Sequence, residues 1–227
     1  MVQTFASQTE KLCKIWRTKE QGSEIDVTSD FSKLTLNIIG LTAFGFDFDS
    51  FGEEDSIGKQ ATTRFTNLIA GGNSNIANML VFFFPPLVNL PIGLFRNVKD
   101  DINYTNDLVR ALIKEKRLHA ANQEDSIDQH NNLLDILLAS QDTKSMTDQQ
   151  LADHVKTLMF AGHETTATLT TWCIYALSRE PEIVSKLKEE LDEKVSDPSA
   201  ITYESLESLK YLKAVIKETL RMYPPVG

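Results

Sequence analysis

The sequence predicts a mainly α-helical protein. Apolar residues recur three and four positions apart through most of the 227 residues, which is the spacing that places them on one face of a helix. One such pattern runs unbroken from Asp148 to about Arg179, roughly 32 residues or about 48 Å of helix. Convincing strand patterns, in which apolar and polar residues alternate, are missing. We therefore expect a single helical domain over 1–227 with one very long helix, covered on several sides, at its centre.

The first two helices are predicted from amphipathic patterns and their end signals. Residues 2–20 place Phe5, Leu12 and Trp16 near one face, and Gly22 suits the stop. A second helix is expected to begin at a cap within residues 28–30. Its buried face would consist of Phe31, Leu34, Ile38, Leu41 and Phe44. Phenylalanines alternate with acidic residues over 45–52, which suggests a turn packed by aromatic rings, without the ligand spacing of a calcium loop.

The most hydrophobic stretch, residues 79–88, contains Pro85 and Pro86. It follows a helix expected over 56–70 that ends at Gly71 and Gly72. The stretch is too short to span a bilayer, and its prolines argue against a regular helix or a central strand. An apolar connector of this kind needs a surface to lie on: a core, a membrane surface or an apolar ligand.

The second half of the sequence is helical by the same criteria. Thr147 and Gln150 have the spacing of a capping box, which marks the start of the long helix. Pro181 separates that helix from a charged one, and a polar segment over 121–130 separates two earlier helices. The expected helices are, in order, 94–120, 131–140, 148–179, 182–195, 203–209 and 211–223.

Composition excludes several functional classes. The formal net charge is -9 and the one basic cluster (Lys114, Lys116 and Arg117) is short, so nucleic acid is not an expected partner. No stretch of about 18 uncharged apolar residues exists, so no membrane span or anchor is expected. Cys13 and Cys173 form no metal-ligand pattern and are interpreted as buried or half-buried thiols. No metal ligand is therefore predicted in this chain.

Two short motifs stand out within the predicted helices. Residues 161–166 (AGHETT) place a glycine and two threonines in the middle of the longest helix, where glycine alone costs about 1 kcal/mol relative to alanine. They are either a functional notch or a solvated polar turn on a surface helix. Residues 218–221 (ETLR) place Glu218 and Arg221 three positions apart, where the two side chains share a face and can pair.

Together these motifs resemble those of the cytochrome P-450 superfamily, the haem-thiolate monooxygenases, of a eukaryotic microsomal type. Residues 161–166 resemble the oxygen-activation motif of that family. Residues 218–221 resemble its ExxR motif, and they are followed by Tyr223, Pro224 and Pro225 as is usual there. The helix order matches throughout, from the family's D helix through its K helix. The resemblance implies a partial cytochrome P-450 fold that lacks the β-sheets and the cysteine-ligand loop.

The same resemblance implies a function. The whole enzyme would bind haem b (iron protoporphyrin IX) and insert one oxygen atom of O2 into a hydrophobic small-molecule substrate, with electrons from an NADPH-dependent reductase. Thr165 would contact the haem-bound oxygen and hold a water, and Glu164 would link the site to solvent protons. Ala161 and Gly162 would make room for the macrocycle, with a local opening of the helix at Gly162. His163 is expected to be packed or solvated rather than an iron ligand.

The remaining residues receive supporting roles by resemblance. Glu218 and Arg221 would be structural and brace the proximal side of the haem pocket. The apolar region 82–88 would roof the substrate pocket, and the connector over 79–95 could touch a membrane surface. For the full-length enzyme that membrane would be the endoplasmic reticulum membrane. The expected substrate-pocket residues are Phe82, Phe83, Phe84, Phe160 and Val226.

The sequence also departs from the family. The iron-ligating cysteine of the family lies in a loop well after the ExxR motif, whereas this sequence ends at Gly227. Neither Cys13 nor Cys173 is expected to replace that ligand, so this chain alone is expected to be inactive, as the middle part of such an enzyme. The alternative is a truncated, non-catalytic helical interaction module that binds no haem. The substrate and the particular redox partner stay open.

Overall fold

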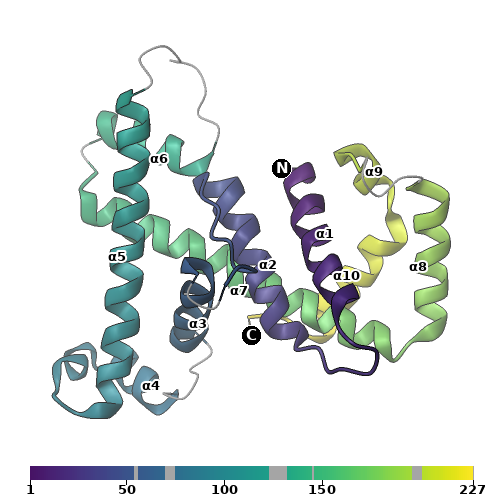
Figure 1. The fold of residues 1–227 in the computed structure, drawn as a ribbon, viewed down its shortest axis with the longest axis horizontal. Coiled ribbons are helices and arrows are strands. Elements are labelled where there is room, and N and C mark those ends of the chain that lie inside the picture. Colours follow the sequence, from purple (N-terminus) through teal and green to yellow (C-terminus); the bar gives the residue numbers. More distant parts are fainter. Residues whose placement is uncertain (54–55, 70–74, 123–131, 145, 196–200, 227) are drawn as a thin grey trace.

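The structure is a computed structural model that describes residues 1–53, 56–69, 75–122, 132–144, 146–195 and 201–226. These residues form helices and connecting segments without a strand, so the prediction of a mainly α fold is confirmed (Figure 1). The elements are α1 (Val2–Thr18), α2 (Val27–Ile39), the π-helical turn η1 (Gly40–Phe44), α3 (Ile57–Ile69), α4 (Asn75–Phe83), the 3-10 turn η3 (Pro85–Asn89), α5 (Gly93–Asn122), α6 (Leu133–Lys144), α7 (Asp148–Ser178), α8 (Pro181–Lys194), α9 (Tyr203–Ser208) and α10 (Lys210–Met222).

Helix α7 is the axis of the molecule. It spans 31 residues, and both ends lie within one residue of the expected range. Its start is a complete capping box, in which the Thr147 hydroxyl accepts from the Gln150 backbone N–H at 3.2 Å and the Gln150 side chain accepts from the Thr147 N–H at 2.9 Å. The next helix begins directly at Pro181, where the missing N–H of proline costs nothing.

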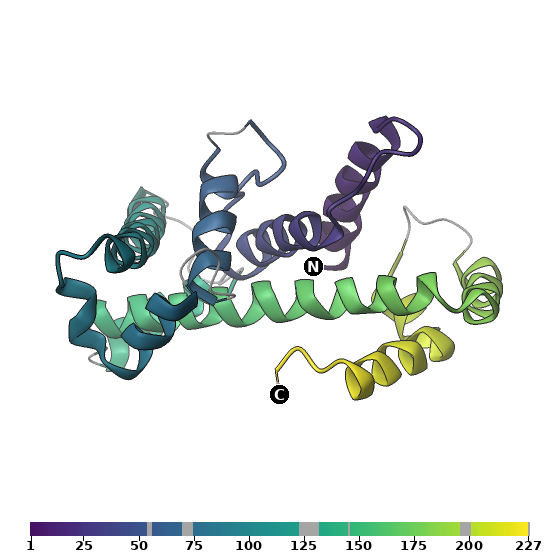
Figure 2. The ribbon, with the colours of Figure 1, turned by 90° about the horizontal axis from the view of Figure 1, so that it is seen from below.

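The other helices cover α7 from two sides. Seen from below, α1, α2 and α3 lie on one side of α7 and α10 lies on the other (Figure 2). Helix α2 makes the most extensive packing against α7, whereas α5 and α6 pack near its N-terminal half and α8 and α10 near its C-terminal half.

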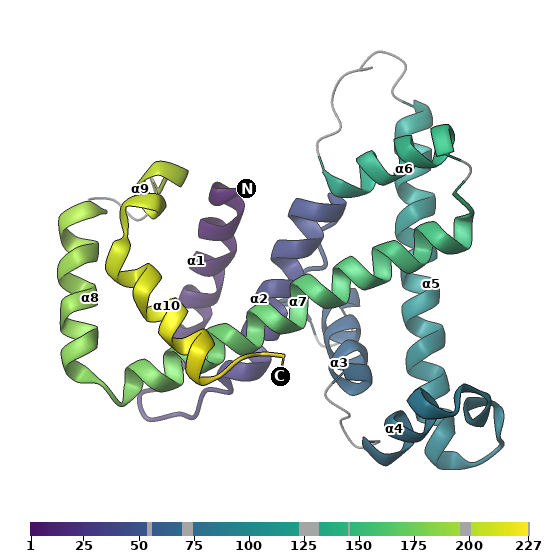
Figure 3. The ribbon, with the colours of Figure 1, turned by 180° about the vertical axis from the view of Figure 1, so that it is seen from behind.

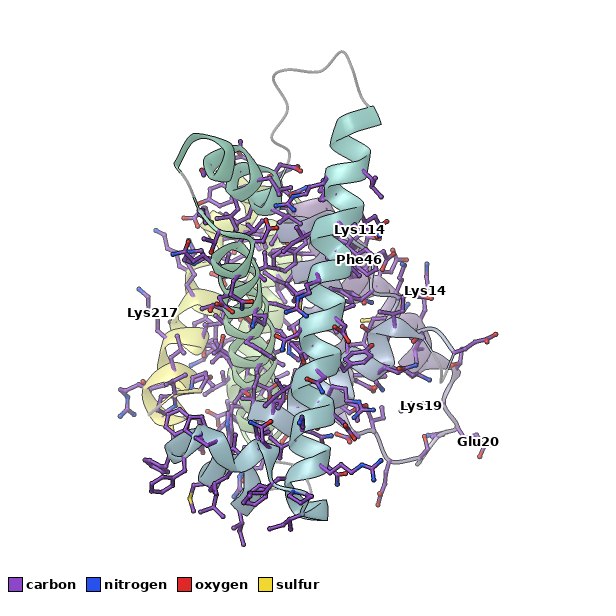
Figure 4. All side chains as sticks on the ribbon, turned by 90° about the vertical axis from the view of Figure 1, so that its left-hand side faces the viewer. Lys14, Lys19, Glu20, Phe46, Lys114 and Lys217 are labelled. Atoms are coloured by element: carbon purple, nitrogen blue, oxygen red, sulfur yellow. The ribbon has the colours of Figure 1, made fainter. Side chains whose placement is uncertain are left out.

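A continuous stripe of α7 enters the core. Its buried members recur at intervals of three and four residues, the helical period: Leu151, Ala152, Val155, Met159, His163 and Ala167. The first four of these residues pack in one core cluster with Phe44, Phe65 and Leu134 from other elements. Ala167 packs in a second cluster with Leu12, Phe31 and Leu34 of α1 and α2. In contrast to these buried side chains, the exposed side chains of Lys14, Lys114 and Lys217 project away from the helices (Figure 4). The aromatic turn expected over 45–52 is confirmed, because Phe48 is 1% exposed and packs edge-on against Phe46 at 5.0 Å.

The second helix differs from the prediction at both ends. Its cap is Asp26, whose carboxylate accepts from the Ser29 N–H at 3.0 Å, so residues 28–30 already form the first turn. At the other end, α2 continues as η1, whose first residue Gly40 lies against the Phe48 ring. Gly45 then ends the turn at φ 66°, a left-handed conformation that favours glycine.

The expectation that 79–88 forms no regular helix is wrong for its first part. Residues 75–83 form α4, and Pro85 opens the separate turn η3. The reason is that a proline restricts its own position and the residue before it, Phe84, and leaves the helix up to Phe83 intact. Other boundaries also shifted: α6 runs to Lys144 instead of 140. The predicted stop at Gly71 and Gly72 and most of the polar segment 121–130 lie outside the described residues.

The close packing at Gly40 predicts a large effect on stability. A Cβ atom there would lie 2.5 Å from Phe48 Cδ2 and 2.6 Å from the Phe46 carbonyl oxygen. Because the second neighbour is backbone and cannot move aside cheaply, Gly40→Ala should lower the free energy of unfolding by about 1–3 kcal/mol. Denaturant unfolding would measure the change. Gly93→Ala is the matched control, since nothing lies within 4 Å of its added Cβ, and an equal loss in both variants would contradict the packing argument.

Candidate functional site

The 161–166 motif lies in the middle of α7, where it has one packed face and one open face. Successive residues of a helix are turned by about 100°, so Ala161 and Thr165 point roughly away from His163. His163 is 0% exposed and Ala167 is 3% exposed, whereas Ala161 is exposed and Thr165 half-buried. The motif therefore contributes two different sets of side chains to two different environments.

The packed face holds α2 against α7. A Cβ atom on Gly162 would lie 2.7 Å from Ile39 Cδ1, so the glycine leaves the space that the Ile39 side chain occupies. His163 packs beside the Phe65 ring, with the two ring centres 6.0 Å apart, and its Nε2 lies 2.8 Å from the Ser32 hydroxyl. Of the two environments expected for His163, packed or solvated, the structure shows the packed one. The local opening expected at Gly162 is not seen, because α7 is regular α-helix across the motif.

The open face carries small side chains. The Thr165 hydroxyl donates to the Ala161 carbonyl oxygen at 2.6 Å, four residues earlier on the helix. That bond uses its one donor and leaves two lone pairs able to accept. Thr168 and Trp172 follow Thr165 on the same face at intervals of three and four residues. Trp172 stacks on Tyr223, with ring centres 4.6 Å apart and planes within 5°, so the end of α10 contacts the C-terminal part of this face (Figure 2).

Glu164 lies at the border between the two faces. Its side chain is 20% exposed, and burial raises its pKa above the ordinary value. Burial has the opposite effect on the neighbouring imidazole and lowers the pKa of His163 to about 4, because it penalises the charged form in both. At neutral pH the histidine is therefore uncharged, while Glu164 exchanges its proton at a higher pH than an exposed glutamate.

The second motif forms the predicted ion pair. Arg221 Nε and a terminal nitrogen donate to the two Glu218 oxygens at 2.8 and 2.6 Å. The Glu218 side chain is 56% exposed and the Arg221 side chain is 69% exposed, so solvent weakens the contribution of this pair to stability. The hydrogen bond and charge of Arg221 lower the pKa of Glu218. The pair lies on α10, away from the 161–166 motif on the chain but linked to α7 through Tyr223.

The residues predicted to line a substrate pocket are not brought together. Phe82, Phe83 and Phe84 are 80%, 66% and 62% exposed at the end of α4, which lies far from the C-terminus in all three ribbon views (Figure 3). Phe160 is half-buried and packs against the core, edge-on to the Phe65 ring with the ring centres 5.0 Å apart. Val226, near the C-terminus, is 73% exposed.

Two residues of the site arrangement escaped the sequence analysis. Ser32 binds His163 from a position 131 residues earlier, and no local pattern marks it. Glu190 of α8 accepts from the Tyr211 and Leu212 backbone N–H groups at 2.8 and 2.9 Å and so caps α10. A carboxylate facing the first N–H groups of a helix is a common arrangement, but only the fold shows that α8 supplies it.

Within the described residues, no group of three histidine, cysteine, aspartate or glutamate side chains is placed to hold a metal ion. Cys13 and Cys173 are half-buried free thiols on α1 and α7. Among the helices that the structure describes, none combines the length and the apolar character needed to cross a membrane.

The buried histidine predicts a pH dependence of stability. The pKa of His163 is about 4 in the folded protein and near 6.5 when unfolded, so the unfolded chain binds the extra proton first. The free energy of unfolding is therefore unaffected by this group above pH 6.5. It decreases as the pH falls towards 4, by about 3 kcal/mol in total. We expect His163→Gln to flatten this part of the profile, as measured by denaturant unfolding at several pH values. An unchanged slope would show that His163 is not the titrating group, and His154→Gln at an exposed position is the control.

Comparison with known proteins gives a consistent result. Cytochrome P-450 monooxygenase 205 of Postia placenta is 32% identical over 100% of this chain and 44% of its own length. Protein LUTEIN DEFICIENT 5, chloroplastic, of Arabidopsis thaliana is 31% identical over 99% of the chain and 38% of its own length. The bifunctional cytochrome P-450/NADPH–P-450 reductase 2 of Bacillus subtilis is 31% identical over 94% of the chain and 19% of its own length.

The chain thus spans less than half the length of these relatives. The family model for cytochrome P-450 matches residues 1–227. The match includes the 161–166 motif on α7 and the paired Glu218 and Arg221 on α10. The chain belongs to the cytochrome P-450 family.

Proposed function

We propose that this chain supplies the distal, oxygen-handling side of the active site of a haem-dependent monooxygenase. The whole protein would insert one oxygen atom of O2 into a hydrophobic organic substrate, with electrons from an NADPH-dependent reductase. Family membership supports the haem and the reaction class. The observation that carries the assignment to these residues is the open face of α7, which carries the Thr165 hydroxyl and is bordered, one residue earlier, by a partly buried Glu164 with a raised pKa.

The residues on the open face fit a flat macrocycle. Ala161, Thr165 and Thr168 have short side chains and lie opposite the stripe that packs into the core. When bound there, haem b would supply the iron at which oxygen is bound and reduced. We propose that Ala161 and Thr165 lie against the ring. Gly162 would contribute from the other side, because the space it leaves holds Ile39 and fixes the position of α2.

The polar residues would hold and move protons. The Thr165 hydroxyl donates to the Ala161 carbonyl oxygen, and a rotation about its χ1 angle would let it donate into the open face instead, at a cost of about 1 kcal/mol for the lost bond. Its lone pairs can accept a hydrogen bond from a water meanwhile. Glu164 lies one residue away, and its raised pKa lets the carboxyl group take up a proton from solvent and release it towards Thr165.

Other parts of the chain would have supporting roles. Glu218 and Arg221 would be structural, since their bidentate pair presents an exposed carboxylate that could accept a further arginine of the whole protein. Phe82, Phe83 and Phe84 would form an apolar surface at the substrate entrance or against a membrane. Phe160 and Val226 would reach the substrate only in the assembled enzyme. Some relatives are named as chloroplastic, and a location at the endoplasmic reticulum stays a prediction.

A carbon monoxide spectrum of the reduced protein tests the haem assignment. We expect the whole protein to show the Soret band of cysteinate-ligated haem. We expect the 227-residue chain with added haemin to lack that band, because neither cysteine lies on the open face. Cys13 is on α1, which lies on the side of α7 that α2 covers, and Cys173 is turned by about 80° from Thr165 around the axis of α7. A thiolate band from the chain alone would contradict its expected inactivity. Absence of haem from the whole protein would favour the non-catalytic interaction module.

The hydroxyl of Thr165 provides the sharper test. Thr165→Ala in the whole enzyme should lower the fraction of consumed oxygen that appears in product several-fold, because the proton donor at the open face is removed, while Thr165→Ser should retain most of it. Oxygen uptake and product formation measured together give this ratio. Thr170→Ala is the matched control: its hydroxyl donates to the Thr166 carbonyl oxygen at 2.8 Å in the same way but lies on another face of the helix. Unchanged coupling in Thr165→Ala would contradict the proposed role.

A further inference from the structure

A buried polar cluster lies between α2 and α7, directly behind the open face. Ser32 of α2 is 5% exposed and His163 of α7 is 0% exposed, and the Ser32 Oγ to His163 Nε2 distance is 2.8 Å. The other ring nitrogen, Nδ1, lies 3.8 Å from Glu164 Oε2. Among the described residues, neither Nδ1 nor Oε2 has a hydrogen-bond partner, although both atoms are buried. Two facing polar atoms of this kind call for an explanation, because an unsatisfied buried group costs about 1–3 kcal/mol.

The cluster favours one tautomer of the histidine. A neutral imidazole carries its proton on one nitrogen only, and the other nitrogen accepts. The Ser32 hydroxyl can donate to Nε2, and the carboxylate of Glu164 next to Nδ1 attracts a positive hydrogen atom at that position. Both neighbours are therefore satisfied best when Nδ1 carries the proton and Nε2 accepts from Ser32. The opposite tautomer would set a lone pair against the carboxylate oxygen.

We propose that His163, held by Ser32, is a positioning residue that presents its Nδ1–H to the Glu164 carboxyl group and so sets the proton affinity of that carboxyl group. This inference rests on the proposed role of Glu164 in proton delivery. The gap of 3.8 Å exceeds a hydrogen bond, but it lies within the range in which the N–H dipole acts on a buried charge. The edge-on contact with the Phe65 ring limits rotation of the imidazole away from this arrangement.

The surroundings of His163 indicate that its ring acts on Glu164 as a neutral N–H dipole and not as a cation. Burial keeps the pKa of His163 near 4, so the ring acts on Glu164 as a neutral donor at physiological pH. Burial alone accounts for the raised pKa of Glu164, without an opposing charged side chain among the described residues. An N–H aimed at the carboxylate favours its charged form and holds the pKa lower than burial would leave it. Glu164 would then be able both to bind a proton and to release it.

Two substitutions of the same residue separate the two ring nitrogens. Asparagine retains a donor near the position of Nδ1, whereas glutamine reaches the position of Nε2 and leaves no donor near Glu164. The readout is the carboxyl stretching band of Glu164 in infrared difference spectra of the whole protein, titrated against pH and identified by its loss in Glu164→Gln. We expect the midpoint to rise by about one pH unit, a tenfold change in the ionisation constant, in His163→Gln. It should stay close to the wild-type value in His163→Asn.

Two further measurements complete the test. Nitrogen-15 spectra of labelled histidine should show Nδ1 protonated and Nε2 accepting in the wild type, with a mixture of tautomers in Ser32→Ala. His154→Gln, at an exposed position of the same helix, is the control and should change neither readout. Equal midpoints in the glutamine and asparagine variants, or a wild-type ring protonated on Nε2, would overturn the proposal.

The outcome is independent of the test of Thr165. If the Glu164 midpoint responds to His163→Gln but coupling survives Thr165→Ala, the positioning contact exists and the proposed proton delivery is wrong. If the coupling of oxygen uptake to product depends on Thr165 while the titration midpoint of Glu164 is unchanged in His163→Gln, the proposed function stands and this inference fails. Should the glutamine variant not fold, Ser32→Ala still tests the contact, since loss of the donor to Nε2 should move the midpoint upwards by a smaller amount.

Discussion

The contact between α2 and α7 decides the character of the site. Gly162 leaves room for Ile39, which allows the two helices to approach closely along the buried stripe of α7. That approach covers His163 completely and, because the helix is regular, turns Thr165 away from the core. A bulkier residue at 162 would push back Ile39 and with it the helix that carries Ser32. The open face of α7 thus lies opposite the face that packs tightly against α2.

Neighbouring residues of the motif acquire opposite properties from the same physical cause. Burial lowers the pKa of His163 and raises the pKa of Glu164, since it disfavours a cation in one case and an anion in the other. The two side chains face each other at 3.8 Å on the border between core and open face. A neutral imidazole beside a carboxyl group of raised pKa is an arrangement suited to handling protons near neutral pH.

The long helix also connects the 161–166 motif with the 218–221 motif. They are separated by more than fifty positions in the sequence, yet Trp172 on α7 stacks on Tyr223 at the end of α10. Glu190 of α8 caps the start of α10 and fixes its orientation. The fold thereby aligns the exposed pair of Glu218 and Arg221 with the C-terminal half of the same helix that carries Thr165.

Local physics determined what the sequence alone could show. Helix caps and the helical period depend on residues three and four positions apart. The capping box at Thr147, the length of α7 and the Glu218–Arg221 pair could therefore be predicted from the sequence. The tertiary structure decided which surfaces are covered. Phe160 packs against Phe65 and becomes half-buried, and Ser32, 131 residues earlier, forms part of the environment of His163. Such contacts join residues distant in the chain, and no sequence period encodes them.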